Sequence, residues 1–468
     1  MPLFITILVA KIILWASRTS GRGGGSALPG LVAEKLDPQI ITKLASRIPR
    51  GSIVITGTNG KTTTSKMLAG VLGTGRARII TKKAGSNLYR GIASTLLEHV
   101  SLNGKMKGSS GLCEVEEAAM PQVCLQVQPR QIMVLNLFRD QLDRYGELDT
   151  TAKLIGQGIA ATKAEIFLNA DDPLVASLKR YAPGAVFFFG VEKSTTNKLD
   201  HDHTADSIHC PISGSALSYT QNFFAHLGHY HCPNGDFKRP APTYKVEYDE
   251  EGMLIRHKRH QARLSINLPG LYNAYNALAA FALAEHNGLN TEFIISQLEN
   301  VQAAFGRVEK VRVGNKTLHL LLIKNPTGFN QIIQTFLVHS PHQLLIAIND
   351  NFADGRDVSW LWDAAIEDMH AGHKVQVSGV RAADMALRLK YAGIESELEP
   401  DLERAVNAYT TLQKTVAEGA GAAGLAAMLA NPDRFRGRRV GLILSGGNID
   451  PRILASITVR ELEREKRI

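Results

Sequence analysis

The residues best suited to chemistry lie in a short loop that joins a β-branched run to a helical pattern. Glycines in such a loop let backbone N–H groups turn towards phosphate oxygens, and the start of a helix favours negative charge. Lys61 can reach the terminal phosphates of a nucleoside triphosphate, and the hydroxyl of Thr62 can ligate Mg²⁺. The predicted nucleotide-binding residues of the loop are Gly57, Thr58, Asn59, Gly60, Lys61, Thr62 and Thr63.

The spacing of this loop departs from the general phosphate-loop pattern. That pattern places four residues between its two glycines, whereas Gly57 and Gly60 enclose only two. A glycine-rich turn can also be purely structural. Here the Gly-Lys-Thr run stands between a predicted strand and a predicted helix, which favours phosphate binding.

The elements that must position the loop follow from the hydrophobic pattern. In the N-terminal part, short β-rich runs alternate with helical patterns, which predicts an α/β domain with a largely parallel sheet. The buried strands expected there are residues 53–56, 132–137, 165–169 and 186–189, and a helix is expected at 272–287.

A second α/β stretch begins near Val311, with strands expected at 318–323, 344–348, 374–378 and 440–445. Between the two stretches, at about 192–242, the sequence changes to His, Ser, Asn, Gly and isolated Cys, which indicates a small insertion. We therefore expect a nucleotide-binding domain at 1–305 and a C-terminal α/β domain at 306–468.

Composition limits the class of protein. Lys and Arg number 53 against 44 Asp and Glu, and the net charge of +9 suits a phosphate-bearing substrate or an anionic membrane surface. The basic residues are scattered and no nucleic-acid-binding motif is present, so no nucleic acid is expected as a partner. The four cysteines are too few for a disulfide framework, which favours a reducing compartment and thus the cytoplasm.

The chain opens with an apolar run at residues 3–16 that is interrupted by Lys11. This run is shorter than the ~20 residues that span a bilayer, and it lacks the basic start of a signal peptide. We expect a helix that packs on the domain or lies at the inner face of a membrane.

The Gly-Thr-Asn-Gly-Lys-Thr-Thr-Thr run at 57–64 resembles the Mur ligase and folylpolyglutamate synthase superfamily. Members of that superfamily activate a carboxylate as an acyl phosphate before an amine attacks it. The resemblance implies ATP and Mg²⁺ as cofactors, a Mur ligase-type central domain, and a Rossmann-like C-terminal domain.

The same resemblance gives roles to residues outside the loop. Glu114, in Cys-Glu-Val-Glu-Glu, matches the acid that holds Mg²⁺ with Thr62, although alone it would be a solvated charge. Asn276 matches a residue of the helix that contacts adenine, and its structural alternative is a helix cap or core amide. Arg307, after Gly306, favours the nucleotide role. Lys61 and Glu114 are thus expected to be catalytic.

Longer stretches resemble the MurT family within this superfamily, over roughly residues 1–412. The matching stretches are residues 136–147, 169–173, 273–276, 324–328 and 349–360. The resemblance implies amidation of the D-glutamate α-carboxylate of lipid II to D-isoglutamine, in peptidoglycan synthesis. It also implies a GatD-type glutaminase partner that supplies ammonia.

Within the stretch 349–360, one aspartate of Asp-Gly-x-Asp-x-Ser-Trp has a role in the family. It orients the catalytic histidine of the glutaminase, which completes a Cys-His-Asp arrangement across the two subunits. A carboxylate on an imidazole N–H fixes the tautomer and the orientation of the ring. We assign this role to Asp357, with Asp354 as the alternative, and either residue could instead cap a turn.

The insertion departs from the family pattern of a four-cysteine zinc ribbon. Beside Cys210 and Cys232, Ser213 and Gly235 stand where thiolates are expected. Nearby histidines could substitute, but adjacent residues of a strand point to opposite faces. These histidines are His203, His209, His229 and His231. Because a structural zinc site needs about four good ligands, we predict a degenerate site that has lost zinc.

The C-terminal segment at about 416–468 departs further and resembles the end of the catalytic domain of threonine dehydratase. Ser445 matches the residue that meets the ring nitrogen of pyridoxal phosphate there. The Schiff-base lysine motif and the phosphate loop of that family are absent, so dehydratase chemistry is not expected. We interpret the segment as a fused or misjoined fragment whose strand could complete a sheet edge.

Two other functions stay open at this point. An amino-acid-adding ligase similar to folylpolyglutamate synthase is disfavoured by the Asp357 motif and the cysteine remnants. A nucleotide-binding scaffold without catalysis is disfavoured because Lys61, Thr62 and Glu114 are all present.

Overall fold

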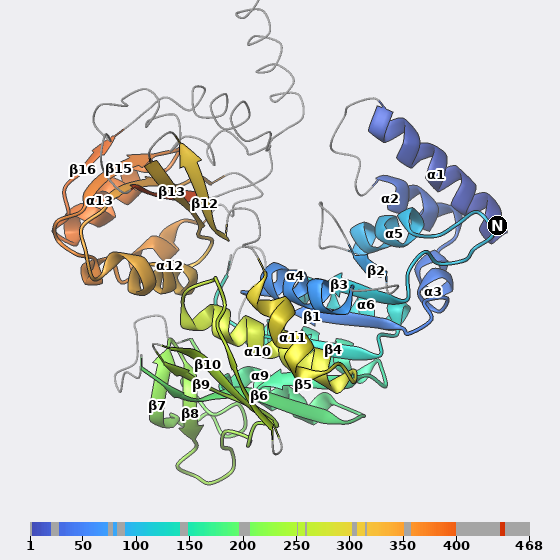
Figure 1. The fold of residues 1–468 in the computed structure, drawn as a ribbon, viewed down its shortest axis with the longest axis horizontal. Coiled ribbons are helices and arrows are strands. Elements are labelled where there is room, and N and C mark those ends of the chain that lie inside the picture. The colour runs from blue at the N-terminus through green and yellow to red at the C-terminus, as the bar shows by residue number, and fades with distance from the viewer. Residues whose placement is uncertain are drawn as a thin grey trace, which may run out of the picture. The chain divides into compact units, whose positions relative to one another are not determined.

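The computed structural model describes most of the chain up to Leu398 and one later strand. The described residues are 2–19, 28–73, 78–81, 89–140, 148–195, 206–249, 251–257, 260–301, 307–313, 316–350, 357–398 and 440–444. They belong to two compact units, the first drawn from residues 1–139 and 145–302, and the second from residues 303–468 with the short segment 140–144 (Figure 1). Gly306, Asp354, His203, Ser445 and the rest of 416–468 apart from 440–444 lie outside the described residues.

The first unit is built on a nine-stranded sheet in the order β11-β10-β9-β6-β5-β4-β1-β3-β2. Its strands are β1 Ser52–Thr56, β2 Ile79–Thr81, β3 Ser110–Glu114, β4 Gln131–Val134, β5 Glu165–Asn169, β6 Val186–Ser194, β9 Tyr244–Asp249, β10 Gly252–His257 and β11 His260–Leu264. All neighbours from β2 to β9 pair in parallel, and only β9, β10 and β11 pair antiparallel. The prediction of a largely parallel sheet is confirmed.

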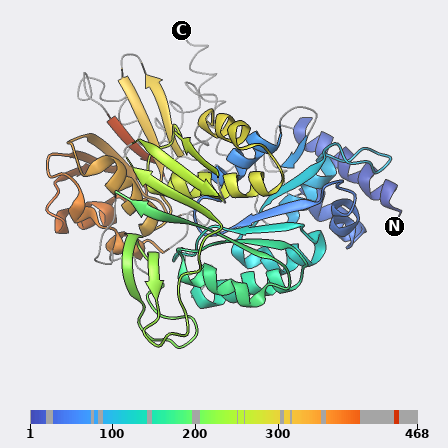
Figure 2. The same ribbon diagram turned by 60° about the horizontal axis from the view of Figure 1, so that its bottom comes forward.

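Helices cover both faces of this sheet, so its central strands β1 and β4 are buried along their whole length (Figure 2). One layer holds α4 Lys61–Leu72, α10 Leu271–His286 and α11 Thr291–Glu299, which pack on one another. The other holds α6 Met120–Val127, α8 Leu148–Ala160 and the short α9 Pro173–Ser177. The helix predicted at 272–287 is α10, displaced by one residue.

The strand predicted at 132–137 is shorter in the structure, since β4 ends at Val134. The residues that follow leave the sheet because side chains take over their backbone groups. The N–H of Leu137 donates to the carboxylate of Asp172 at 2.8 Å. A local side-chain acceptor of this kind is invisible to hydrophobic periodicity.

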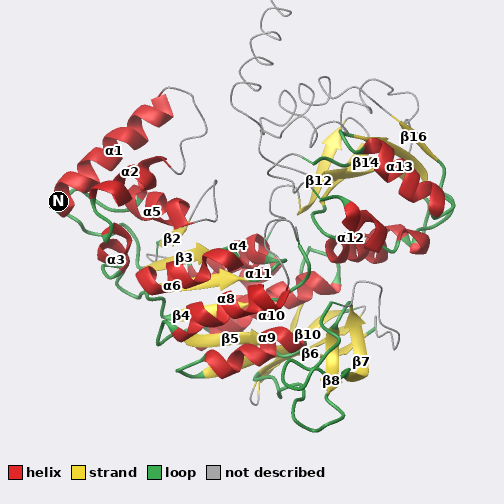
Figure 3. Ribbon diagram, turned by 180° about the vertical axis from the view of Figure 1, so that it is seen from behind, coloured by secondary structure: helices red, strands yellow, loops and turns green. Residues whose placement is uncertain are grey.

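Four helices gather beyond the β2 edge of the sheet (Figures 1 and 3). They are α1 Leu3–Thr19, α2 Leu28–Leu36, α3 Ile40–Ala45 and α5 Tyr89–Glu98. α1 packs on α2 and α5 through a face that includes the buried residues Ile7 and Ala10. Among the described helices, none is long and apolar enough to cross a bilayer.

The region predicted as an insertion contains a separate two-stranded antiparallel sheet, β7 Ser218–Phe224 and β8 Leu227–His231. Polar contacts hold it to the main sheet. The hydroxyl of Tyr230 donates to the carbonyl of Ala170 at 3.0 Å, and the guanidinium of Arg239 donates to Asp171 at 2.6 Å. The hairpin is therefore fixed to the carboxyl end of β5.

The second unit contains a six-stranded sheet in the order β12-β13-β17-β14-β15-β16. Its strands are β12 Arg307–Val313, β13 Lys316–Leu322, β14 Gln343–Ala347, β15 Lys374–Ser378, β16 Ser396–Leu398 and β17 Val440–Leu444. Only β12 and β13 pair antiparallel. Its helices are α12 Pro326–Ile332 and α13 Ala382–Tyr391, with the π-helical turn η3 Ile333–Leu337 and the 3₁₀ turns η4 Ser359–Asp363 and η5 Ile366–Asp368. The four strands predicted here are confirmed as β13, β14, β15 and β17.

The position expected for the last of these strands was wrong. We expected it at an edge of the sheet, but β17 lies in the interior and pairs in parallel with both β13 and β14. Its sequence, Val-Gly-Leu-Ile-Leu, has no charged residue. An uncharged apolar run suits a strand with neighbours on both sides, where parallel sheets are covered on both faces.

Candidate nucleotide-binding site

The predicted phosphate loop leads from β1 into α4, at the carboxyl end of a central strand. Two of its glycines have backbone conformations that disfavour other residues, with φ of +128° at Gly57 and +88° at Gly60. A Cβ at Gly57 would lie 2.9 Å from the backbone oxygen of Asn136, and one at Gly60 would collide with the side-chain amide of Asn276. The loop therefore leaves no room for side chains at these positions.

The segment after β4 holds the loop in place. The N–H of Asn59 donates to Oδ1 of Asn136 at 2.8 Å, and Nδ2 of Asn136 donates back to the carbonyl of Asn59 at 3.1 Å. The N–H of Phe138 donates to the hydroxyl of Thr58 at 2.9 Å. Sequence reasoning gave Asn136 no role. Asn136 directly follows a parallel strand and lies at the same sheet edge as the loop, and this position could have indicated its role.

Lys61 is the first residue of α4, and its ammonium group curls back over the loop. Its Nζ donates to the carbonyl of Gly57 at 2.6 Å and to Oε1 of Glu117 at 3.0 Å, with the carbonyl of Thr58 at 3.4 Å. The side chains of Lys61 and Glu117 are only 14% and 8% exposed. Glu117, which starts the short 3₁₀ turn η1 Glu117–Ala119, was not identified from the sequence.

Thr62 and Glu114, the predicted Mg²⁺ ligands, lie together. The hydroxyl of Thr62 donates to Oε2 of Glu114 at 3.0 Å. The two residues meet because β3 pairs with β1 so that Glu114 lies opposite Ile55, just before the loop. A hydroxyl and a carboxylate are the oxygen donors that Mg²⁺ prefers, so the donor set fits this ion.

Asn276 lies at the contact between α4 and α10, and the predicted Thr63 lies in the first turn of α4. Thr63 is buried, and the hydroxyl of Thr64 donates to Oδ1 of Asn276 at 3.3 Å. Asn276 is thus next to the phosphate loop, as a nucleotide-binding residue must be. Its side chain is also a buried amide in the core, which was the structural alternative stated for Asn276 from the sequence.

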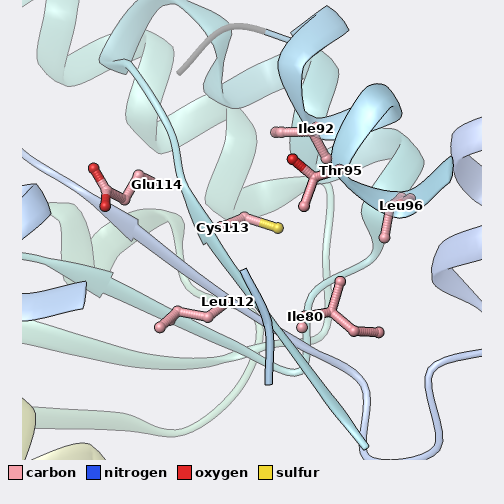
Figure 4. Close-up of a pocket in the computed structure, with 8 residues that line it drawn as sticks. Ile80, Ile92, Thr95, Leu96, Leu112, Cys113 and Glu114 are labelled. Carbon is pink, nitrogen blue, oxygen red and sulfur yellow. The ribbon is translucent and has the colours of Figure 1, made fainter. Parts of the chain in front are cut away.

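A small apolar pocket lies on the other side of β3 from the loop (Figure 4). Cys113 points towards α5 there, whereas Glu114 points away from it, as alternation along a strand requires. Burial raises the pKa of the Cys113 thiol to about 12. This thiol is therefore protonated and unreactive at neutral pH.

Two predicted site residues belong to the second unit. Arg307 begins β12, and its side chain is not described. Asp357 precedes η4 and accepts the N–H of Ser359 at 2.8 Å. Hydrogen bonds from Ser359 hold the pKa of this carboxyl below its usual range. Asp357 thus caps a turn and is also an ionised, partly exposed carboxylate.

In the insertion, ligand atoms of Cys210, Cys232 and Asp236 all lie within 4.8 Å of one another. The thiol of Cys210 donates to Asp236 at 3.4 Å, and the hydroxyl of Ser213 lies 3.4 Å from Sγ of Cys232. Within the described part of the insertion, no histidine joins this group. Three strong donors fall short of the four that a closed structural zinc site uses, so zinc does not fit the set.

Asp236 was missed from the sequence as a member of this group. It follows Gly235, whose φ of +75° turns the chain back towards the cysteines. Hydrogen bonding to Asp236 raises the pKa of the Cys232 thiol, which keeps its proton in place. Zinc binding would have to displace that proton.

Comparison with known proteins decides the family. The Mur ligase middle domain family matches residues 55–284, and the MurT ligase C-terminal family matches residues 322–419. The MurT subunit of lipid II isoglutaminyl synthase from Streptococcus pneumoniae is 36% identical over 387 residues, which is 80% of this chain and 84% of that one. The chain belongs to the MurT family. A second MurT subunit, from Staphylococcus aureus, is 33% identical over 84% of this chain and 89% of its own length.

Solved structures support the fold of this MurT family member. A pseudomurein peptide ligase type C from Methanothermus fervidus has a TM-score of 0.64 and 20% identity, over 89% of this chain and 80% of the other. The MurF ligase from Thermotoga maritima, solved in complex with ADP, has a TM-score of 0.57 and 14% identity, over 92% and 84%. The Mur ligase-type α/β fold is thereby confirmed, and the MurT-specific match includes Asp357 and ends near the start of the dehydratase-like segment.

Proposed function

We propose that this chain is the synthetase subunit of a lipid II isoglutaminyl synthase, a carbon–nitrogen ligase with glutamine as amido donor. It amidates the α-carboxylate of D-glutamate in lipid II, with ammonia from a GatD-type glutaminase, during peptidoglycan synthesis. Relatives at 33–36% identity carry that name. The observation that supports it best is the arrangement of Lys61, Thr62 and Glu114 around the glycine loop.

The reaction has two steps. A carboxylate oxygen of the substrate attacks the γ-phosphorus of ATP, ADP leaves, and an acyl phosphate forms. Ammonia then attacks the acyl carbon, and inorganic phosphate leaves with the oxygen. Lys61 offsets negative charge on the transferred phosphoryl group, and the backbone of Gly57 to Thr63 holds the phosphates.

We propose that Thr62 and Glu114 hold the Mg²⁺ that accompanies ATP. When bound, that ion neutralises charge shared between the β- and γ-phosphates. Glu114 also keeps the Thr62 hydroxyl oriented before the ion arrives, through the bond at 3.0 Å. Asn276 on α10 is proposed to contact the base, and Arg307 the nucleotide.

The second unit, divided from the first at residues 305/306, is proposed to be a Rossmann-like domain that carries the partner contact. There Asp357 would orient the catalytic histidine of the glutaminase. Its ionised state supports this role, because a carboxylate both accepts the imidazole N–H and stabilises the positive charge that forms on the ring. We place the enzyme in the cytoplasm, at the face of the membrane where lipid II is exposed. The insertion is proposed to be a degenerate ribbon without zinc.

The test is amidation of lipid II by the chain with ATP and Mg²⁺. Nitrogen is supplied either as ammonium chloride or as glutamine with a GatD-type partner. Lys61→Ala is expected to lose amidation with both sources, and Asp357→Asn only with glutamine. Asp384→Asn, at an exposed aspartate of the second unit, serves as the control and is expected to match the wild type.

Two outcomes would replace this function. If ATP binds but no amide forms from either nitrogen source, the chain is a nucleotide-binding scaffold. If an added amino acid is joined to the carboxylate in place of ammonia, the chain is an amino-acid ligase of the folylpolyglutamate synthase type.

A further inference from the structure

Helix α1 has two different apolar faces. One face packs on α2 and α5 and contains the buried residues Thr6, Ile7 and Ala10. The other carries large exposed side chains, which are Phe4 at 52%, Ile5 at 41%, Leu8 at 36%, Ile12 at 55% and Trp15 at 68% exposure. Large exposed apolar side chains gathered in one place mark an interaction site.

The exposed side chains follow helical spacing. Phe4, Leu8, Ile12 and Trp15 are separated by four, four and three residues, so they form one stripe along the helix. Among the side chains of α1 that the structure describes, residues 3–16, each exposed one is apolar. α1 thus presents a continuous apolar stripe on the side opposite its buried residues. We call this stripe the outer face of α1.

The sequence of α1 and the net charge of the chain favour an anionic partner. The sequence of α1 contains Lys11 and Arg18 but no Asp or Glu. Lys11 donates to the carbonyl of Leu97 on α5 at 3.2 Å, so its ammonium group lies on the packing side of α1. On α2, Glu34 lies 3.7 Å from Arg90, which offsets its negative charge. The net charge of +9 on the whole chain adds a weak attraction to anionic headgroups.

We propose that the outer face of α1 docks on an anionic lipid surface, with the helix lying in the plane of the headgroups. The proposal rests on the proposed function, whose substrate is lipid-linked. The lipid-facing set combines aliphatic side chains with Trp15, and Trp is enriched at membrane interfaces. At 17 residues with Lys11 inside it, the helix lies on the bilayer and does not span it.

A second copy of the chain fits this face less well. Five side chains on one helix form a narrow strip, whereas a stable dimer buries about 800 Å² on each partner. A membrane surface needs no such area, because weak, reversible attachment is enough to keep an enzyme near a lipid-linked substrate. The narrow strip therefore matches a peripheral lipid contact.

The experiment measures sedimentation of the full chain with vesicles. One set contains phosphatidylglycerol and phosphatidylethanolamine, and the other contains only phosphatidylcholine. The wild type is expected to bind the anionic set, less so at high salt. The double variant Leu8→Gln/Ile12→Gln is expected to bind at least about tenfold more weakly. Leu125→Gln, at a 63%-exposed leucine on α6, is the matched control and is expected to bind like the wild type.

The same variants separate docking from catalysis. On a water-soluble lipid II analogue with a shortened lipid, the double variant is expected to amidate at the wild-type rate. On lipid II in vesicles it is expected to be slower. If the wild type does not amidate the soluble analogue, the proposed function is wrong. Vesicle sedimentation still tests the docking of α1 in that case.

Two results would overturn the docking. The first is a wild type that stays in the supernatant with both kinds of vesicle. The second is a concentration-dependent dimer of the wild type that the double variant abolishes, without vesicle binding. That result would assign the outer face of α1 to a second copy of the chain.

Discussion

Lys61 is held by its own protein before any nucleotide arrives. An ammonium group has three donors, and Gly57, Thr58 and Glu117 supply three acceptors for them. An incoming phosphate must take over at least one of these bonds. Glu117 is the partner that carries charge and is itself buried, so it sets where the ammonium group waits.

We predict that Glu117→Gln lowers kcat for ATP-dependent amidation roughly tenfold, because a charge-assisted bond to Lys61 becomes a neutral one. The KM for ATP is expected to stay the same or fall, since Lys61 is freer to meet phosphate. Steady-state kinetics with varied ATP measures both quantities.

The control for this prediction is Glu116→Gln, which changes the neighbouring acid. A purely structural role of Glu117 would reduce the melting temperature and leave kcat per folded molecule unchanged. A rise in the KM for ATP with unchanged kcat would also contradict the positioning role.

Among single residues, the sequence predicted those that belong to a recognisable motif. The loop from Gly57 to Thr63 was predicted from its local pattern, and Glu114 was predicted from the family resemblance. Glu117 and Asn136 were not, because their contacts join positions 56 and 77 residues apart. Such contacts exist only after β1, β3 and β4 have paired, and no local pattern encodes them.

The start of α4 depends on two elements, the loop that precedes it and α10 beside it. Gly60 has φ of +88° and lies against Asn276 of α10, whereas Gly70 of the same helix has no neighbour near its missing side chain. The same substitution is therefore expected to have opposite effects at the two ends of α4.

We predict that Gly60→Ala weakens ATP binding at least about tenfold, because the loop must shift away from Asn276. Gly70→Ala is expected to stabilise the protein by about 0.5–1 kcal/mol, since alanine favours a helix interior. Isothermal titration with ATP and thermal unfolding measure the two effects. Equal ATP affinities in both variants would show that the Gly60 conformation is unimportant.

The insertion allows a gain-of-ligand experiment. We predict that the wild type purifies with well below one zinc per chain, because its donor set lacks a fourth strong ligand. Ser213→Cys adds a thiolate beside Cys232, where the hydroxyl now lies 3.4 Å away, and is expected to bind about one zinc. Plasma mass spectrometry measures the metal content.

The prediction would be wrong if the wild type purified with one zinc per chain and the Asp236→Ala variant purified without it. In that case Asp236 would be a true third ligand, and a further donor would complete the tetrahedron. Ser213→Ala, which removes only the hydroxyl, would then show whether that donor is Ser213.

The sequence predicted which segments of the second unit form strands better than it predicted the order of those strands in the sheet. Apolar runs located β13, β14, β15 and β17 within a few residues, because buried parallel strands are short and apolar. The interior place of β17 was not predicted. Its neighbours β13 and β14 precede it by about a hundred residues, and strand periodicity carries no information on pairing between distant segments.

For the molecule as a whole, residues 440–444 of the dehydratase-like segment form a strand of the second unit. This strand is β17, whose Leu442 pairs with Leu320 of β13 and with Leu345 of β14. We predict that Leu442→Pro unfolds the second unit, because proline in a central strand removes a ladder hydrogen bond and cannot be accommodated between two neighbouring strands. Amidation is expected to be lost, while the first unit survives limited proteolysis.

Leu442→Val is the control, since valine keeps both the backbone donor and the apolar character of the strand. It is expected to retain amidation and a wild-type proteolysis pattern. An active Leu442→Pro variant with an intact second unit would mean that β13 and β14 do not depend on β17.

The interior position of β17 has a consequence for how the protein is made. During synthesis, β12 to β16 are made before β17, which lies between β13 and β14 in the finished sheet. Until β17 is made, the sheet of the second unit lacks a central strand. Two exposed strand edges invite pairing with other chains. The second unit therefore reaches its final sheet late and by a long-range pairing step, which is slow to form, and this period is when a molecular chaperone would be needed most.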